Sequence, residues 1–213
     1  MVWWIAGGLL VLAYLLGSVP TGFAIAKLLK GIDIRDHGSG NTGATNVFRV
    51  VGKQAGITVL VIDLLKGLTT VLFTRFVLNH IAGGIDGGPT LDSWNNWIQI
   101  LAGLLAILGH SRSVWLNFTG GKSAATGLGV LLALAWPVGL GTAAIFGLVF
   151  GGSRTVSLGS ISAATAAPVL MFLTGQPLPF SLLALLGGLY VIIRHRSNIS
   201  RLLAGTEPKL GSS

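Results

Sequence analysis

The chain has 213 residues, of which 52% are hydrophobic and 9% are charged, and its mean hydropathy is +0.79. A soluble domain carries about 25% charged residues, so most of the surface of this protein is expected to face lipid. The absence of cysteine excludes disulfides, zinc–thiolate sites and cysteine nucleophiles. The net charge of +8 comes from basic residues scattered between apolar segments. This pattern favours anionic lipid and phosphate, rather than nucleic acid, as the partner.

Seven apolar stretches separated by polar breaks predict an all-α, polytopic membrane protein. No basic segment precedes the first stretch, so it predicts a transmembrane helix rather than a cleavable signal peptide. A full span needs about 20 apolar residues, so some of the helices are expected to be short. The stretches cover residues 2–26, 55–78, 97–109, 124–135, 138–150, 158–174 and 179–193.

The distribution of basic residues decides how the segment 124–152 is divided. As one straight helix it would be about 43 Å long, against a hydrocarbon core of about 30 Å. A break at Trp136-Pro137 gives two short helices, and the basic loops 27–53 and 110–123 then share one side with the basic C-terminal tail. The positive-inside rule therefore predicts seven transmembrane helices, with the N-terminus outside and the C-terminus cytosolic. Such a protein is expected in the inner (plasma) membrane, with its active site on the cytosolic face.

The chain shows no internal repeat and no linker, so residues 1–205 are expected to form a single integral membrane domain. Residues 206–213 are polar and are expected to be disordered. The sequence is compatible with a monomer.

The first polar segment that could carry chemistry is residues 37–46, which is rich in glycine, hydroxyl and amide side chains and is followed by Arg49. Such a loop can direct N–H groups at an anion, and a guanidinium close by suits phosphate. Gly38, Gly40 and Gly43 formally match a dinucleotide-binding motif, but a membrane helix precedes them where that motif needs a strand. The alternative is a flexible loop without a ligand.

The second segment, residues 109–123, ends in two glycines and Lys122 at the start of a helix. A helix N-terminus and an ammonium group both favour a bound anion. A nucleotide-binding P-loop is excluded, because Leu116 occupies the position of its first glycine. The alternative is a lysine whose ammonium reaches the membrane interface.

The third segment, residues 194–198, directly follows the last apolar stretch. Its His195 is a candidate acid or base, because the ordinary pKa of histidine lies near neutrality. The alternative is a basic cluster that binds anionic lipid headgroups. Asp63 and Lys66 lie three residues apart within the second apolar stretch and are interpreted as a structural ion pair.

Taken together, these segments resemble the bacterial acyl-phosphate:glycerol-3-phosphate acyltransferase family of the PlsY type. The resemblance covers nearly the whole chain, and the motifs occur in the family's order. They are Gly17-Ser18-Val19-Pro20-Thr21-Gly22, Gly38-Ser39-Gly40-Asn41-Thr42-Gly43-Ala44-Thr45-Asn46 with Arg49 and Gly52-Lys53, Asp63-Leu64-Leu65-Lys66-Gly67, Gly109-His110, Gly120-Gly121-Lys122, Ser157-Leu158, and Arg194-His195-Arg196 with Asn198.

The resemblance implies transfer of a fatty acyl group from acyl phosphate to the 1-hydroxyl of glycerol 3-phosphate, giving lysophosphatidic acid and phosphate. It implies no cofactor and no metal. The residues implied to bind acyl phosphate are Ser39, Gly40, Asn41, Gly43, Thr45 and Asn46. Those implied to bind glycerol 3-phosphate are Arg49, Lys122, Ser157, His195 and Asn198, and those implied to be catalytic are His195, Asn198 and Ser39.

Two departures from the family pattern bear on the mechanism. Ser123 stands where the family usually has the last glycine of Gly-Gly-Lys-Gly, and Ser197 stands where it usually has a glutamate. The second departure argues against a carboxylate base in this segment. The proton acceptor is therefore expected to be His195 or the phosphate of a substrate, with positioning and hydrogen-bond donors supplying most of the catalysis.

Two other functions fit parts of the pattern. A transporter of a phosphorylated metabolite would place polar residues and broken helices near the bilayer midplane, often in two related repeats. No repeat is present, and the polar groups gather at one predicted face. A scaffold that binds anionic lipid would need basic residues but not the glycine- and asparagine-rich loops.

Overall fold

The structure is a computed structural model that describes residues 2–84 and 88–211, and these residues are almost entirely helical. The chain divides into two compact units, Met1–Leu134 (unit 1) and Ala135–Ser213 (unit 2). The apolar stretches predicted from the sequence all lie on helices, so the all-α prediction is confirmed. One long helix extends to Gly84 and the next begins at Gly88, so the described residues between the second and third predicted stretches are helical.

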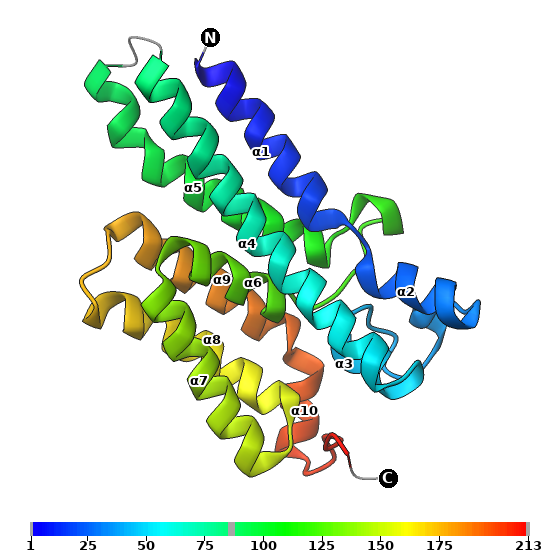
Figure 1. The fold of residues 1–213 in the computed structure, drawn as a ribbon. Coiled ribbons are helices and arrows are strands. Elements are labelled where there is room, and N and C mark those ends of the chain that lie inside the picture. The colour runs from blue at the N-terminus through cyan, green and yellow to red at the C-terminus, as the bar shows by residue number, and fades with distance from the viewer. Residues whose placement is uncertain (1, 85–87, 212–213) are drawn as a thin grey trace. The chain divides into compact units, whose positions relative to one another are not determined.

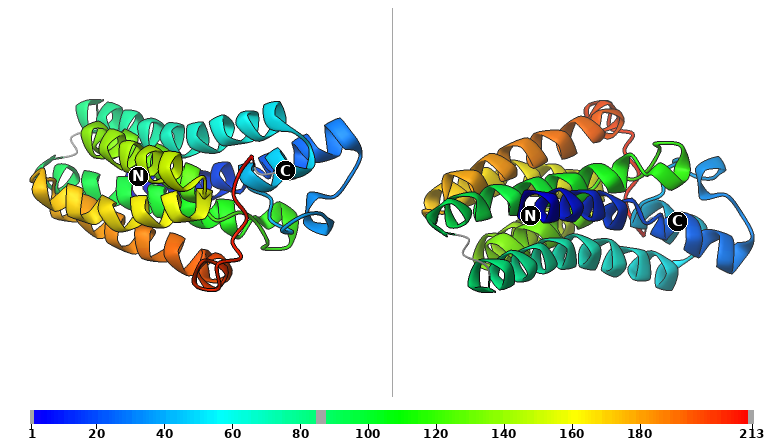
Figure 2. Two further views of the ribbon diagram at one scale, coloured as in Figure 1. Left: turned by 90° about the horizontal axis from the view of Figure 1, so that it is seen from below. Right: turned by 90° about the horizontal axis from the view of Figure 1, so that it is seen from above.

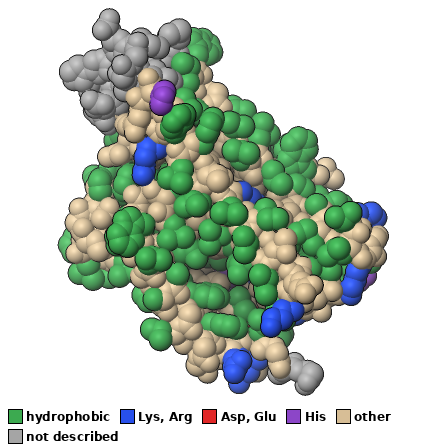
Figure 3. Space-filling view, viewed as in Figure 1, with side chains coloured by type: hydrophobic (Ala, Val, Ile, Leu, Met, Phe, Trp, Pro, Cys, Tyr) green, Lys and Arg blue, Asp and Glu red, His purple; other side chains and the backbone are tan. Residues whose placement is uncertain are grey.

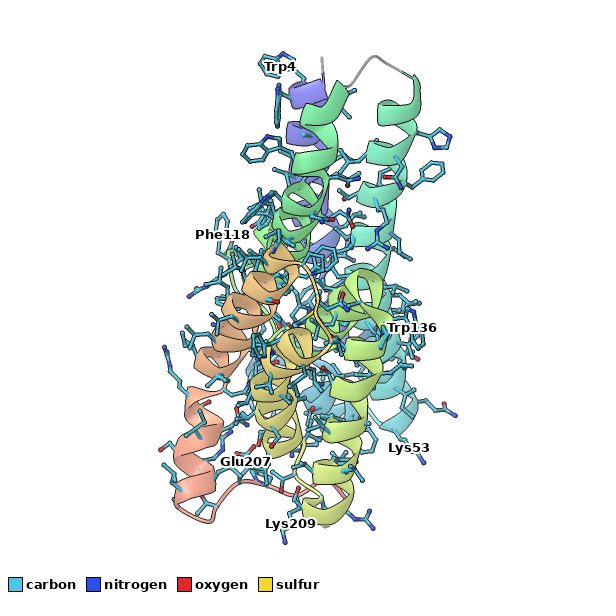
Figure 4. All side chains as sticks on the ribbon, turned by 90° about the vertical axis from the view of Figure 1, so that its left-hand side faces the viewer. Trp4, Lys53, Phe118, Trp136, Glu207 and Lys209 are labelled. Carbon is cyan, nitrogen blue, oxygen red and sulfur yellow. The ribbon has the colours of Figure 1, made fainter. Side chains whose placement is uncertain are left out.

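The long helices of unit 1 run side by side (Figures 1 and 2). They are α1 (Val2–Ser18), α4 (Lys53–Gly84) and α5 (Gly88–Ser111), and the shorter α6 (Ala124–Leu134) packs against α4. At one end of unit 1, buried apolar residues from three elements pack against the start of α4. These elements are α2 (Thr21–Lys30), the 3-10 turn η1 (Ile34–Asp36) and α3 (Ala44–Val50). Trp4 lies at the opposite end of this unit from Lys53 (Figure 4).

The first apolar stretch is broken between α1 and α2, whereas the sequence predicted one continuous helix over residues 2–26. Pro20 is the cause, because proline has no N–H and disfavours a helical conformation of the residue before it. The carbonyl groups released at the break still need donors inside a membrane. The Ser113 hydroxyl donates to the carbonyl of Ser18 at 2.6 Å, and the Lys66 ammonium donates to the carbonyl of Val19 at 3.1 Å.

Glycines allow α4 and α6 to approach closely. A Cβ atom built at Gly67 would overlap the carbonyl oxygen of Thr126, and one built at Gly129 would overlap that of Leu64. Acyl chains are as apolar as the helix surfaces, so the hydrophobic effect does not drive helices together in lipid. Helix association there depends on close packing of this kind. The glycine content of the chain is thus used in helix packing.

Unit 2 begins with three helices that pack in chain order, α7 against α8 and α8 against α9 (Figure 1). They are α7 (Trp136–Ser153), α8 (Val156–Leu173) and α9 (Leu178–Arg194). After α9 the chain turns by 61° at His195 into α10 (Arg196–Leu203). The helix break predicted at Trp136-Pro137 is confirmed, because α6 ends at Leu134 and α7 begins at Trp136.

The composition of the helices is that of an integral membrane protein. Within the described residues, four helical segments are long and apolar enough to cross a bilayer, or five if α9 and α10 form one bent span. Large apolar side chains point outward along these helices, as at Leu148 and Phe172, which are 77% and 80% exposed. Hydrophobic side chains also cover much of the face drawn in Figure 3. Such exposure would be costly in water and is the normal lipid-facing surface of a membrane helix.

Candidate functional site

The glycine-rich loop of unit 1 is organised around the side chain of Asn46, which is 2% exposed. Its amide nitrogen is shared between the carbonyl groups of Ile34, His37 and Asn41, at 3.3, 3.0 and 2.9 Å. Its amide oxygen accepts the N–H of Ser39 at 2.9 Å. A single buried amide thus satisfies backbone groups from η1 to Asn41. Asn46 gives the loop its shape through contacts that the sequence did not predict.

Three backbone donors of this loop are engaged within the loop itself. The N–H of Ser39 bonds to Asn46, that of Gly40 to the carbonyl of His37, and that of Gly43 to the Asn41 side chain. The side-chain hydroxyls of Ser39 and Thr45 add donors of a kind that suits an incoming phosphate. Gly40 has φ +68°, a left-handed conformation that favours glycine.

Arg35 precedes this loop, and its side chain has a structural role. Its guanidinium forms a two-point ion pair with Asp33, with the shortest contact at 2.6 Å, and it stacks over the ring of Phe23. The hydrogen bond from Arg35 is the main cause that lowers the pKa of Asp33 to about 2. Arg49 lies three residues beyond Asn46 on α3, and its side chain is exposed.

The second polar segment meets the first within unit 1. The amide nitrogen of Asn41 lies 3.5 Å from the carbonyl oxygen of Gly120, two residues before the partly buried Lys122. The turn that carries Lys122 is fixed to α5 on both sides. The N–H of Gly121 donates to the carbonyl of His110 at 3.1 Å, and the hydroxyl of Ser123 donates to that of Ile107 at 2.7 Å.

In unit 2, three side chains converge on the carboxylate of Glu207; Figure 4 labels Glu207. Ser157, in the first turn of α8, and Asn198, on α10, both donate to its Oε1 atom, at 2.7 and 2.6 Å. Arg201 donates to Oε2 at 2.7 Å. The Glu207 side chain is 6% exposed. Two of the three unit 2 residues predicted to bind substrate, Ser157 and Asn198, thus share one buried carboxylate.

Glu207 and Arg201 were missed by the sequence analysis. Glu207 lies in the segment 206–213, which was expected to be disordered, yet residues 206–211 have defined positions. One signal could have found it. The chain has six acidic residues, and Glu207 is the single one after Asp92. An isolated carboxylate in a basic tail is expected to accept hydrogen bonds from nearby basic and polar side chains.

Burial would raise the pKa of Glu207, but the hydrogen bonds from Asn198, Ser157 and Arg201 outweigh it and hold the pKa below its ordinary value. The group is therefore a carboxylate at neutral pH, with both oxygens occupied by donors. Such a carboxylate is a poor proton acceptor. It can instead orient the Ser157 hydroxyl and the Asn198 amide.

His195 lies at the bend between α9 and α10 and is 4% exposed. Its Nδ1 atom is 2.8 Å from the carbonyl oxygen of Val191. A carbonyl can only accept, so Nδ1 carries the proton and Nε2 is the basic nitrogen of the neutral ring. This arrangement fits the predicted role of His195 as a proton acceptor.

The predicted site residues thus fall into two groups. Unit 1 holds Ser39, Gly40, Asn41, Gly43, Thr45, Asn46, Arg49 and Lys122, and unit 2 holds Ser157, His195 and Asn198. Hydroxyl, amide, guanidinium and ammonium donors dominate both groups. Donors of these kinds are suited to oxyanions and phosphate esters.

Comparison with known proteins gives matches over nearly the full length. A family model described as glycerol-3-phosphate acyltransferase matches residues 7–205. The glycerol-3-phosphate acyltransferase of Acaryochloris marina is 53% identical over 213 residues, which cover 99% of this chain and 95% of that relative. The glycerol-3-phosphate acyltransferase 2 of Rhizobium johnstonii is 55% identical over 216 residues, which cover 99% of both chains.

Solved structures agree with these matches. The crystal structure of PlsY (YgiH), an integral membrane glycerol 3-phosphate acyltransferase, in its glycerol 3-phosphate form superimposes with a TM-score of 0.84 at 40% identity. That match covers 97% of this chain and 96% of the other. The lysophosphatidic acid form of the same protein gives a TM-score of 0.81.

Proposed function

This chain belongs to the glycerol-3-phosphate acyltransferase family, and from that premise we propose that it transfers a fatty acyl group from acyl phosphate to the 1-hydroxyl of sn-glycerol 3-phosphate. The products are lysophosphatidic acid and inorganic phosphate. The observation that carries the proposal is the family match over residues 7–205, which includes all three polar segments.

We assign the acyl-phosphate headgroup to the glycine-rich loop. The Ser39 and Thr45 hydroxyls and the Asn41 amide donate to the phosphate, and Gly40 and Gly43 let the backbone approach it. Asn46 acts from behind by holding the loop in shape. The acyl chain lies among the helices in the bilayer, so the reactive carbonyl is presented at the membrane surface.

We assign glycerol 3-phosphate to Arg49, Lys122, Ser157, His195 and Asn198. Two cationic groups suit its phosphate, because charged hydrogen bonds to phosphate are about twice as strong as neutral ones. Glu207 supports Ser157 and Asn198 rather than taking a proton, since both of its oxygens already accept hydrogen bonds.

The reaction needs little acid catalysis, because acyl phosphate is a mixed anhydride with a good leaving group. The 1-hydroxyl attacks the acyl carbon, the new ester bond forms, and the bond from the acyl carbon to the phosphate oxygen breaks. The hydroxyl proton passes to Nε2 of His195 or to the departing phosphate. Positioning of the two anions and donors on the developing oxyanion supply the rest.

The proposed function is consistent with the number of spans and the orientation of the termini that the sequence predicts. We propose seven spans, an external N-terminus and a cytosolic C-terminus, with the chemistry on the cytosolic face. Glycerol 3-phosphate is water-soluble and acyl phosphate is lipid-bound. An interfacial site lets both reach it.

The direct test is an assay of the protein purified in detergent with radiolabelled glycerol 3-phosphate and palmitoyl phosphate. Formation of lysophosphatidic acid is the expected result, and no product forms when acyl-CoA or acyl carrier protein replaces the acyl phosphate. Product from acyl-CoA alone would overturn the assignment of the donor. Uptake of glycerol 3-phosphate into liposomes without product would support a transporter.

Variants then test the residue assignments. Lys122→Ala and Arg49→Ala should each lower kcat/KM for glycerol 3-phosphate about 100-fold, because each removes a charged phosphate contact. The exposed Lys27→Ala is the matched control and should change little. Near-normal turnover of both site variants would refute their role. For His195→Ala, a small loss in kcat indicates that the substrate phosphate takes the proton, and a large loss indicates His195.

A further inference from the structure

A buried charged cluster in unit 1 lies outside the residues assigned to substrate. Asp63 and Lys66 on α4 are 2% and 8% exposed, and His110 near the end of α5 is 9% exposed. The Lys66 ammonium lies 2.9 Å from the Asp63 carboxylate, and Nδ1 of His110 lies 3.5 Å from the same oxygen. The sequence predicted the Asp63–Lys66 pair and did not include His110 in it.

The Asp63–Lys66 pair has a structural reason of its own. An isolated charge in a membrane helix is costly, so each partner neutralises the other. Lys66 also donates to the carbonyl of Val19, which the proline break leaves without a helical partner. These contacts account for both charged residues on α4. They do not account for a histidine next to the same carboxylate oxygen.

His110 connects the cluster to the turn that carries Lys122. A Cβ atom built at Gly121 would overlap Nε2 of His110, and one built at Gly120 would overlap the His110 carbonyl oxygen. The N–H of Gly121 also donates to that carbonyl at 3.1 Å. The imidazole therefore lies between the Asp63 carboxylate and the backbone of Gly121, in contact with both.

Lys122 follows Gly121 directly, so its backbone position depends on this contact. On its other side, Ser123 is fixed to the carbonyl of Ile107, one turn before His110 on α5. The lysine stem is flexible, so the backbone position sets the region that its ammonium can reach. Small errors in the placement of a substrate-binding group can cost large factors in rate.

We propose that Asp63 and His110 are positioning residues, which hold the Gly120–Gly121 turn and thereby direct Lys122 at the phosphate of glycerol 3-phosphate. Asp63 fixes the imidazole through Nδ1, and the far side of the ring fixes the turn. This inference rests on the proposed role of Lys122 in binding glycerol 3-phosphate. A merely structural role would instead lower stability and affect both substrates alike.

The test is a double-mutant cycle between His110→Asn and Lys122→Ala in the full chain purified in detergent. The asparagine amide keeps a donor where Nδ1 faces Asp63, but it removes the part of the ring that contacts Gly121. Alone, it should lower kcat/KM for glycerol 3-phosphate about 10-fold, mainly through KM, with KM for acyl phosphate changed less than about twofold. The exposed His80→Asn is the matched control and should leave both constants unchanged.

The double variant decides the question. If His110 acts through Lys122, adding His110→Asn to Lys122→Ala has no further effect on kcat/KM for glycerol 3-phosphate beyond about twofold. Independent losses that multiply would overturn the inference while leaving the proposed function intact. An unchanged KM for glycerol 3-phosphate in Lys122→Ala alone would instead overturn the proposed role of Lys122.

Two further variants cover the case in which His110→Asn does not fold. His110→Gln places an amide near Nε2 and keeps the contact with Gly121, so its KM for glycerol 3-phosphate should lie between those of the parent and of Asp63→Asn. The Asp63→Asn variant frees the imidazole without altering its size. An equal rise in KM for both substrates in these two variants would contradict the inference.

Discussion

Ser123 holds a backbone conformation that usually belongs to glycine. Its φ is +63°, in the left-handed region, and its side chain is 1% exposed. Glycine adopts this conformation without a steric penalty, so the serine carries a strain that a glycine would avoid. That strain costs about 1–2 kcal/mol for a residue with a Cβ atom. The hydrogen bond from its hydroxyl to the carbonyl of Ile107 at 2.7 Å offsets part of the cost.

We expect Ser123→Gly to change the free energy of unfolding by less than about 1 kcal/mol, because the relief of strain and the loss of the hydrogen bond nearly cancel. Ser123→Ala keeps the strain and loses the bond, so it should lower the free energy of unfolding by about 1 kcal/mol or more. Thermal unfolding in detergent measures both variants. An alanine variant more stable than the glycine variant would contradict this account.

The short helix α6 shows how an element too small to be stable alone is held in place. Its eleven residues span about 16 Å, roughly half of the hydrocarbon core. Arg75 on α4 donates to the carbonyl of Ala133 at the end of α6 and to the side chain of Gln99 on α5, both at 2.8 Å. A cation at a helix C-terminus also suits the helix dipole. Lys122 therefore precedes a helix that is anchored at its far end.

The C-terminal segment after α10 is an element fixed by polar contacts. The N–H of Leu210 donates to the carbonyl of Arg154, between α7 and α8, at 2.8 Å. Glu207 accepts from Ser157 on α8 and from Asn198 and Arg201 on α10. The segment contributes few apolar contacts, so its position depends on the charge of one carboxylate.

That dependence predicts a pH effect. Because the pKa of Glu207 in the folded protein lies below its ordinary value of about 4.3, its contribution to stability is fully present above that value and is lost as the pH falls through the folded pKa. Glu207→Gln should lower the Tm by about 5 °C at pH 7, because an amide cannot accept from all three donors. The difference from the parent should shrink below about pH 4.

Thermal unfolding in detergent from pH 7 down to pH 3.5 measures this difference. Asp36→Asn is the matched control, because it removes one carboxylate charge at an exposed position. It should produce no such pH-dependent gap. A gap for Glu207→Gln that stays constant over this range would show that the charge of Glu207 is not its cause.

At the scale of the whole molecule, the proposed reaction requires that the three polar segments face the same side of the membrane. Basic residues concentrate in the loops and the tail that the positive-inside rule assigns to the cytosol. Within the described residues, the helices are those of an integral membrane protein with four or five candidate spans. The orientation and the full number of spans follow from the charge pattern as predictions.

Labelling of single cysteines tests the orientation, and the natural chain is a suitable background because it contains no cysteine. Cysteines at the exposed positions Asp36, Trp115 and Lys209 should react with an impermeant maleimide only after spheroplasts are permeabilised. Cysteines at Trp4 and Leu178 should react in intact spheroplasts. Labelling of position 115 in intact spheroplasts, with position 36 labelled only after permeabilisation, would rule out a single cytosolic active site.

Much of the fold could be predicted from the sequence, because the length of an apolar run and the charge of its flanks are local properties. The approximate positions of the long apolar helices, the break before Trp136 and the membrane class follow from such runs, whereas the break at Pro20 and the full extent of α4 and α5 do not. The family also followed from the sequence, since its motifs are short segments read in order. The polar segments could be found in the same way, because glycine, asparagine and basic residues are unusual between apolar helices.

The tertiary structure decided how those residues are used, because a polar group in a membrane protein takes its partner from wherever the fold brings one. Asn46 was predicted to hold a phosphate, and its amide in fact holds the loop backbone. Lys66 donates a hydrogen bond to the carbonyl of Val19, which lies 47 residues away at the proline break. Glu207 lies in a segment with too few apolar residues for order to be predicted. Hydrogen bonds from three donors nevertheless hold its carboxylate in place. Such partnerships depend on distance in space, on which local composition carries no information.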